Sequence, residues 1–336
     1  MVGTVDVLYV RGVDQFAVRD VNLLPPVGIA AGEGGRAMYG TIDPATGEST
    51  PGRRNAAFGP VIEMFNRSGD RAWSLAWQLQ KRFARGTELG AAYTYTDARD
   101  RQSTPLDQTY DNLAASPLDG TWERPNLRPS IYSRPHKVTL TGTFDLPLMF
   151  QLGIIYSGFS GDPLTYTVLG DANADGIDNP HHHDQDNDPV YVPRDATDVT
   201  LENPDDFPRL EQIIRQESCL RRQRGRLLER NSCRQSWISF LNVRLTKVLP
   251  SARGQSLQLS VDAFNVLNLV DKDWGLLRFT SGEGGTGGLA RVPLLQLVAY
   301  DGEHARGVYR LLAPQFRQVD ADFSRWKLRL SARYVF

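Results

Sequence analysis

Residues 323–336 read Phe-Ser-Arg-Trp-Lys-Leu-Arg-Leu-Ser-Ala-Arg-Tyr-Val-Phe, and their pattern indicates the fold class of the chain. Every second residue back from Phe336 to Trp326 is apolar or aromatic, while four of the five residues on the other parity are cationic. Because successive side chains of a strand point to opposite faces, the stretch predicts a strand with one apolar face and one hydrated face. Its length of about ten residues suits a tilted transmembrane strand. The alternative is an edge strand of a soluble β-sandwich, which seldom carries so many arginines in a row.

The same alternation recurs in seven other segments of the chain. They cover residues 5–9, 73–79, 89–95, 138–144, 150–156, 237–245 and 257–263. Any one of these segments could be an ordinary half-buried strand. Because all seven show the same alternation of apolar and polar residues, we interpret them as strands of a single sheet. We therefore expect an all-β chain, an antiparallel transmembrane β-barrel meander of about eight long strands.

The connections between these segments are alternately short and long. The short ones cover residues 84–86, 145–148 and 250–254, and the long ones 13–69, 98–134, 161–236 and 269–322. Outer-membrane barrels have short periplasmic turns and longer extracellular loops. This rule predicts extracellular long loops and a periplasmic C-terminus. Residues 60–65, 292–300 and 306–312 are candidates for shorter extracellular hairpins.

The amino-acid composition is compatible with a barrel, and the net charge gives no reason to expect a nucleic-acid partner. The formal net charge is −1, which gives no support for a nucleic-acid partner. The chain has no long apolar run, so the sequence predicts no transmembrane helix. Barrel strands would not appear as apolar runs in a hydropathy profile, because half of the residues in each strand are polar. Gly, Pro, Asn and Asp gather between the apolar stretches, as is typical of an all-β chain with long loops.

Several motifs resemble one family of outer-membrane barrels. Residues 257–268, Leu-Gln-Leu-Ser-Val-Asp-Ala-Phe-Asn-Val-Leu-Asn, are similar to the penultimate strand of TonB-dependent receptors, which ends in a Phe-Asn-x-x-Asn turn. Residues 80–83 and 93–97 resemble the downstream hairpins of the same barrels. The terminal Phe336 resembles the signal read by the barrel-assembly machinery. Residues 187–193 and the segment between Cys219 and Cys233 resemble the Oar-like subgroup.

This resemblance implies a larger, 22-stranded barrel of which the chain forms the C-terminal third. Met1 to Asp6 lacks the basic start and apolar core of a signal peptide, and the chain has no room for a plug or a TonB box. We therefore expect one partial barrel domain over residues 1–336, with no plug and no signal peptide. The expected partners are outer-membrane lipid and lipopolysaccharide, the missing N-terminal barrel and plug, and the TonB complex through that missing part. The substrate is unknown.

One loop carries a candidate cation site. Asp171, Asn173, Asp175 and Asp178 place side-chain oxygens around a glycine, which is the start of a calcium-loop pattern. Position twelve of that pattern is His182 rather than Glu, so no EF-hand is expected. Three further carboxylates could complete the coordination, namely Asp184, Asp186 and Asp188. The alternative is a solvated acidic loop, and no other cofactor is expected.

The remaining polar motifs point away from catalysis. His181, His182 and His183 are adjacent, so they cannot all face one ion in an extended chain, and a polar loop is the favoured interpretation. We find no Ser-His-Asp arrangement and no paired carboxylates, and we expect no enzyme activity. Residues 206–220 predict a short amphipathic helix, because a cap and an early proline precede apolar residues at helical spacing. The arginines around it could capture an anionic ligand, but a solvated helix face is the simpler interpretation.

The chain has two cysteines, Cys219 and Cys233, both in one predicted extracellular loop. Disulfides persist outside the reducing cytosol, so we expect these two to form one. Two free thiols or a metal pair are the alternatives, and a metal pair would lack two further ligands nearby in the sequence.

Two functions remain. The first is the C-terminal barrel portion of a TonB-dependent outer-membrane transporter or receptor, which takes up a substrate too large or too scarce for porins. The second is an outer-membrane surface or adhesion protein whose long loops bind partners without transport. Both place the chain in the bacterial outer membrane.

Overall fold

The computed structural model describes residues 1–177, 187–250, 255–281 and 291–336. Eight long strands form one meander in which every neighbouring pair is antiparallel. In sheet order they are β1 (Val2–Arg11), β8 (Arg71–Arg82), β9 (Glu88–Asp100), β11 (His136–Leu146), β12 (Phe150–Phe159), β19 (Ile238–Pro250), β20 (Ser256–Phe264) and β25 (Lys327–Val335). We call them the main sheet. The all-β prediction is confirmed.

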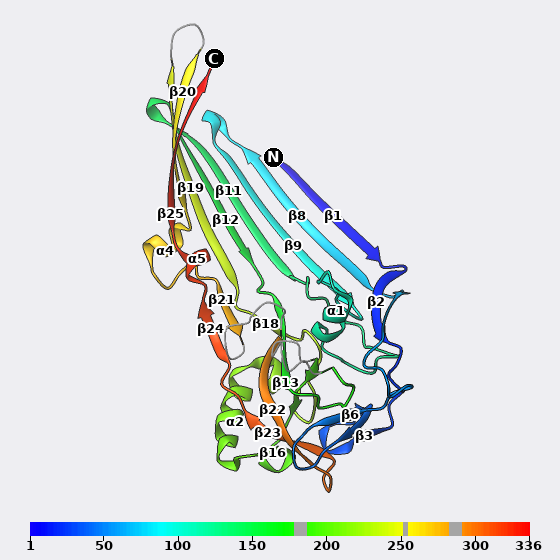
Figure 1. Cartoon of the computed structure of the whole chain (residues 1–336). Coiled ribbons are helices and arrows are strands. Elements are labelled where there is room, and N and C mark those ends of the chain that lie inside the picture. Colours follow the sequence, from blue (N-terminus) through cyan, green and yellow to red (C-terminus); the bar gives the residue numbers. More distant parts are fainter. Residues whose placement is uncertain (178–186, 251–254, 282–290) are drawn as a thin grey trace.

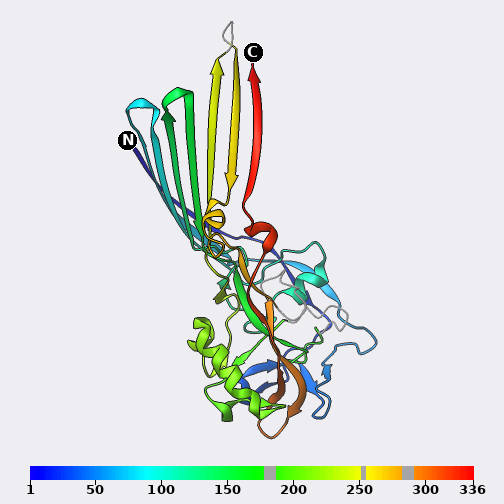
Figure 2. The same cartoon turned by 90° about the vertical axis from the view of Figure 1, so that its left-hand side faces the viewer.

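The main sheet is curved and open (Figures 1 and 2). β1 and β25 form its two edges, and among the described residues they do not pair with each other. Because every neighbouring pair is antiparallel and the strands number eight, these two edge strands run in opposite directions. The expectation of an antiparallel meander whose first and last strands do not pair with each other is confirmed.

The register places the apolar residues of neighbouring strands side by side. Val261 on β20 lies opposite Leu245 on β19 and Leu330 on β25, and Leu245 lies opposite Leu152 on β12. The polar parity is aligned in the same way, with Asp262 opposite both Arg244 and Arg329. A sheet of this kind has one continuous apolar face and one polar face, which is the arrangement a barrel needs between lipid and lumen.

The short and long connections lie at opposite ends of the main sheet, as predicted (Figure 1). Two of the short turns contain single 3₁₀ turns, Ala84–Gly86 and Pro147–Met149. The last strand, β25, has nine residues, close to the ten or so expected, and it begins after Trp326. Phe323 lies in α5 (Ala321–Ser324), because the Asp320 side chain accepts hydrogen bonds from the Asp322 and Phe323 amides and caps this turn.

The long connections pack together as a second body below the strands, which we call the loop unit. Its largest sheet has the order β14–β13–β22–β23–β16, with β18 beside β13. The bounds are β13 (Pro163–Leu169), β14 (Asp188–Pro189), β16 (Thr200–Leu201), β18 (Cys233–Arg234), β22 (Arg291–Asp301) and β23 (Arg306–Leu311). The pairs β13–β22 and β16–β23 are parallel. The loop unit therefore contains parallel pairs, whereas the antiparallel meander was expected only for the eight long strands.

Smaller two-stranded ribbons complete the loop unit. They are β2 (Gln15–Asp20) with β7 (Ile62–Arg67), β3 (Gly28–Ala30) with β4 (Arg36–Met38), β5 (Gly40–Ile42) with β6 (Ser49–Pro51), β15 (Tyr191–Val192) with β17 (Arg226–Leu227), and β21 (Arg278–Ser281) with β24 (Gln315–Val319). β10 (Arg128–Pro129) pairs with the end of β9. The three hairpin segments expected from the sequence correspond to β7, β22 and β23.

The predicted amphipathic helix is confirmed as α2 (Phe207–Gln216), which buries Leu210, Ile213 and Ile214 in the core of the loop unit. The expectation of a single short helix is wrong. The structure also contains α1 (Thr109–Ala115), α3 (Ser218–Arg221), α4 (Val266–Val270) and α5. These four helices have only four to seven residues. They were not predicted because so short a helix has too few turns to produce a helical spacing of apolar residues in the sequence. None of the helices in the described ranges is both long enough and apolar enough to cross a membrane.

Candidate functional site

A buried acidic cluster lies where the long connections meet. We use this name for Asp171, Asp175 and Asp188, whose exposed fractions are 3, 0 and 1 %. Val168 on β13 pairs with Asp188, and the chain turns directly after β13 at Gly170, whose φ of +101° favours glycine. This turn brings both ends of the acidic loop back to the same strand.

Asp171 is held by the loop that it begins. Its carboxylate accepts hydrogen bonds from the amides of Asp175 at 3.0 Å and Gly176 at 2.7 Å. The hydroxyl of Ser49, on β6, donates a third at 2.7 Å. Short polar side chains that accept from the backbone a few residues ahead form tight local turns, which explains why the alternating Asp and Asn residues fold back here.

Asp175 is surrounded by donors from two parts of the chain. Its carboxylate accepts hydrogen bonds from Asn173 Nδ2 at 3.0 Å, Asn187 Nδ2 at 3.2 Å, and Trp122 Nε1 at 2.9 Å. The Trp122 indole comes from the connection between β9 and β11, so it joins two long loops inside the core. These three donors all reach Oδ2, and the Ile177 amide donates to Oδ1 at 2.9 Å, so both oxygens of this buried carboxylate have partners.

Asp188 belongs to a buried ion network with a single cation. Arg36 lies 2.7 Å from Glu33 and 3.3 Å from Asp188, and all three side chains are at most 3 % exposed. Glu33 also accepts hydrogen bonds from the Gly307 amide and the Tyr309 hydroxyl. Arg36 therefore pairs with two carboxylates directly, while Asp171 and Asp175 form no ion pair with any of the described residues.

The excess of buried carboxylates raises their pKa values. Burial and, after it, the neighbouring Asp175 carboxylate raise the pKa of Asp171 to about 7, against the opposing effect of the hydrogen bonds that it accepts. Burial also raises the pKa of Asp175, and it raises that of Asp188 although the Arg36 cation acts in the other direction. Groups of this kind favour a proton or another positive charge in the cluster.

The structure brings together most of the predicted cation-site residues. Asp171, Asn173 and Asp175 lie in one hydrogen-bonded loop, whereas Asp178 lies outside the described residues. The same holds for His181, His182, His183, Asp184 and Asp186. The alternative of a solvated acidic loop is wrong for the acidic cluster, because its three side chains are buried. The described ranges contain no group of three or more His, Cys, Asp or Glu residues arranged to hold a metal ion, so calcium stays a prediction.

The sequence did not predict which side chains surround the acidic cluster. Ser49, Trp122 and Arg36 lie 122, 53 and 152 residues from the carboxylates that they contact. No local spacing connects residues so far apart.

The arginines after α2 are largely committed to internal contacts. Glu211 pairs with Arg215 at 2.6 Å and with Arg224 at 2.8 Å. Arg221 and Arg226 donate to backbone carbonyls. Glu211 therefore neutralises Arg215 and Arg224, whereas Arg221 and Arg226 keep their positive charge at exposed positions.

The predicted disulfide is present. Cys219 and Cys233 are bonded with a Cα–Cα distance of 5.2 Å, which lies in the usual range. The bond joins α3 to β18, and β18 pairs with β13. It therefore ties the helical part of the longest connection to the strand that carries the acidic cluster.

Comparison with known protein families identifies the architecture. A family model described as an outer membrane beta barrel domain matches residues 4–271, which include the first seven strands of the main sheet. The chain belongs to this family. No curated protein and no solved structure matches the chain. Membership places this outer-membrane barrel chain in the outer membrane, in agreement with the apolar face of its main sheet.

The acidic cluster gives the barrel chain a pH-dependent stability. Because the folded-state pKa of Asp171 is raised, its contribution to the free energy of unfolding is greatest below the unfolded pKa of 3.8 and declines as the pH rises towards about 7. We expect Asp171→Asn to remove a contribution on the order of 4 kcal/mol across this window. Thermal unfolding of the purified protein in detergent at pH 4 to 8 measures it. Asp107→Asn, at an exposed site, should follow the wild type, and parallel curves for Asp171→Asn would contradict the expectation.

Loss of the disulfide should loosen the loop unit. Cys219→Ser combined with Cys233→Ser is expected to lower the free energy of unfolding by about 3 kcal/mol, the chain-entropy value for a ring of this size. Limited proteolysis of intact cells, with and without a reductant that does not cross membranes, measures the effect. Equal protease resistance of the reduced and oxidised proteins would show that the bond contributes nothing to the loop unit.

Proposed function

We propose that the chain is the C-terminal barrel portion of a TonB-dependent outer-membrane transporter or receptor. The observation that carries the proposal is the open main sheet, in which eight strands of transmembrane length support a large packed loop unit at one end. An open sheet edge in lipid leaves backbone groups without partners, at a cost of several kcal/mol for each group. The sheet therefore needs further strands, and the resemblance of residues 257–268 to TonB-dependent receptors suggests their source.

The two edges fit that interpretation. β1 and β25 run in opposite directions, so an even number of additional antiparallel strands can close the sheet. We propose that these strands, with a plug, come from the N-terminal part of the same transport system, and that TonB acts only through that part. The apolar face contacts outer-membrane lipid and lipopolysaccharide, and we propose no enzymatic activity and no nucleic-acid partner.

In this proposal the loop unit is extracellular, and the short turns and the C-terminus are periplasmic. An epitope inserted after Glu303, an exposed residue in the turn between β22 and β23, should bind antibody on intact cells. The same epitope in the 84–86 turn should bind only after the outer membrane is permeabilised. The reverse pattern would invert the orientation.

A surface or adhesion protein is the second candidate, and the extensive core of the loop unit favours it as a binding body. Uptake of a panel of labelled compounds separates the two candidates. A transporter should lose accumulation of the same compound when either its own gene or the TonB gene is deleted. A surface binder should lose cell-surface retention when its own gene is deleted and show no dependence on TonB. Accumulation that persists without TonB would refute the transport proposal.

A calcium ion in the acidic loop stays a prediction, with Asp171, Asn173, Asp175 and Asp178 as its expected ligands. The buried carboxylates support it, since they lack a full complement of positive charge. Calcium at pH 8 should raise the unfolding temperature of the wild type and have a smaller effect on Asp175→Asn. Magnesium is the control, since it prefers a stricter octahedral geometry with retained waters. No shift with calcium would end this prediction.

A further inference from the structure

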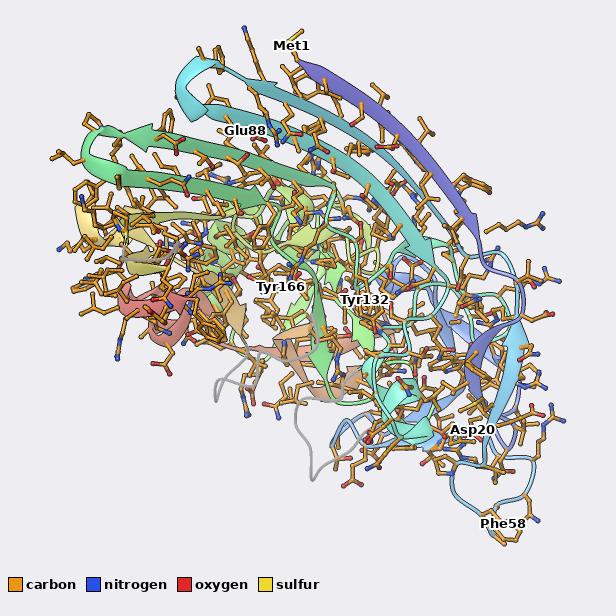
Figure 3. All side chains as sticks on the ribbon, turned by 90° about the horizontal axis from the view of Figure 1, so that it is seen from above. Met1, Asp20, Phe58, Glu88, Tyr132 and Tyr166 are labelled. Carbon is orange, nitrogen blue, oxygen red and sulfur yellow. A yellow bond between two sulfur atoms is a disulfide. The ribbon has the colours of Figure 1, made fainter. Side chains whose placement is uncertain are left out.

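A cavity in the loop unit has an unusual charge pattern. It lies between the β2–β7 ribbon and the loop around Trp122, with a volume of about 640 Å³. Figure 3 shows Asp20, the last residue of β2, on the same side of the molecule as β1. The volume falls in the range of small-molecule sites. Three arginines line the cavity, namely Arg19, Arg54 and Arg67.

Two of these arginines converge on one aromatic ring. The guanidinium carbons of Arg19 and Arg67 lie 4.6 and 4.9 Å from the centre of Phe65. The antiparallel register explains this, because Phe65 lies opposite Ala17, between the neighbouring pairs Arg19–Glu63 and Gln15–Arg67 on the same face of the ribbon. The small Ala17 side chain leaves room for both guanidinium groups beside the ring.

The three cations differ in how they are neutralised. Arg19 pairs with Glu63 at 2.6 Å. Within the described part of the chain, Arg67 donates only to the Trp122 carbonyl, at 3.3 Å, and forms no ion pair. Burial lowers the pKa of Arg67, and the nearby Arg101 and Arg19 cations lower it further against the opposing field of Asp70. Arg54 is exposed, and its side chain forms no hydrogen bond or ion pair within the described ranges.

The acidic residues of the cavity do not cancel this charge. Asp20 is already committed, because its carboxylate pairs with Arg53 and accepts the amides of Asn22 and Val61, each at 2.9 Å. Glu123 lines the cavity from an exposed position, where water and salt screen its charge. The half-buried Arg67 therefore faces the cavity with like charges around it, and an anion there would relieve this repulsion.

The cavity also has apolar lining residues. Val21, Leu23, Pro25 and Phe65 form a wall beside the arginines. Small-molecule sites are typically apolar with a few convergent polar groups that fix the orientation of the ligand. Guanidinium groups bind carboxylate and phosphate through paired hydrogen bonds, which suits an oxyanion head rather than a halide.

We propose that this cavity binds a small organic anion, with a carboxylate or phosphate head on Arg67 and Arg54 and an apolar body against Val21, Leu23 and Pro25. The inference goes beyond uptake, because such a site would serve a transporter and a surface receptor equally. Binding to the purified protein tests it without any transport step, so its failure and that of the proposed function are separable.

The test is calorimetric titration of the full chain in detergent with phenyl phosphate. Saturable binding is expected for the wild type, and Arg67→Gln and Arg54→Gln should each weaken it about tenfold, which equals about 1.4 kcal/mol. The matched control is Arg209→Gln, an exposed arginine on α2 outside the cavity, which should bind as the wild type does. Arg54→Gln keeps the test valid if Arg67→Gln folds poorly, because Arg54 is exposed and its side chain is not part of the core.

Two further ligands test whether the cavity recognises both the anionic head and the apolar body of phenyl phosphate. Inorganic phosphate should bind more weakly than phenyl phosphate, since it lacks the apolar body, and benzyl alcohol should not bind. Equal affinity for benzyl alcohol, or unchanged affinity in both arginine variants, would overturn the proposal. Competition by lipopolysaccharide in the wild type would assign the anionic head to a lipid phosphate, and its absence would assign the head to a soluble compound.

Discussion

Replacing Arg36 with Met is expected to destabilise the loop unit by about 3–5 kcal/mol, the cost of breaking a buried ion pair from one side. The substitution would leave Glu33 and Asp188 without their cation in a core where their side chains are at most 3 % exposed. Asp171 and Asp175 are buried in the same loop, so the remaining negative charge has no compensation. Chemical unfolding of the purified protein and protease resistance of the loop unit in intact cells measure the loss.

Arg310→Met is the matched control for this experiment. Arg310 also pairs with a glutamate, Glu202, at 2.6 Å, but the two side chains are 51 and 44 % exposed. Exposed pairs of this kind contribute about 0–1 kcal/mol. Lowering the pH should reduce the loss in Arg36→Met, because protonation would neutralise the stranded carboxylates. Equal effects of the two substitutions would show that burial of the Arg36 network has no energetic consequence.

Val261→Arg is expected to block membrane assembly. Val261 lies near the middle of β20, between Leu245 and Leu330 on the apolar face of the main sheet. A cationic residue on the lipid face near the bilayer midplane costs about 2–4 kcal/mol. Heat-modifiable mobility of the complete protein in outer-membrane fractions reports correct insertion, and the variant should show a reduced folded band.

Ser260→Arg introduces the same side chain one residue away. Ser260 belongs to the polar face, opposite Thr246 and Ser331, so the arginine would point to the lumen and the folded band should persist. Because both variants introduce an arginine, a difference between them can only come from the face of the sheet on which the arginine lies. If both variants insert equally well, the assignment of the apolar face to lipid is wrong.

Much of the main sheet could be predicted from the sequence. Alternation with a period of two is a local signal, and in residues 257–263 and 326–336 it shows both the strand and which side chains share a face. Alternating short and long connections then predict a meander, because a short turn can only join antiparallel neighbours. The pairing of Cys219 with Cys233 could also be predicted, since no other cysteine competes.

Tertiary structure alone decided how the loops pack and what surrounds the acidic cluster. Arg230, 1 % exposed, joins the loop unit to the main sheet by pairing with Asp100, 130 residues earlier. Arg36 reaches Asp188 across 152 residues, and Trp122 reaches Asp175 across 53. Such contacts follow no period in the sequence, because they depend on how several connections fill one core. The alternation of side chains along a strand is set by its own backbone, whereas the partners of a buried charge are set by whatever the fold brings beside it.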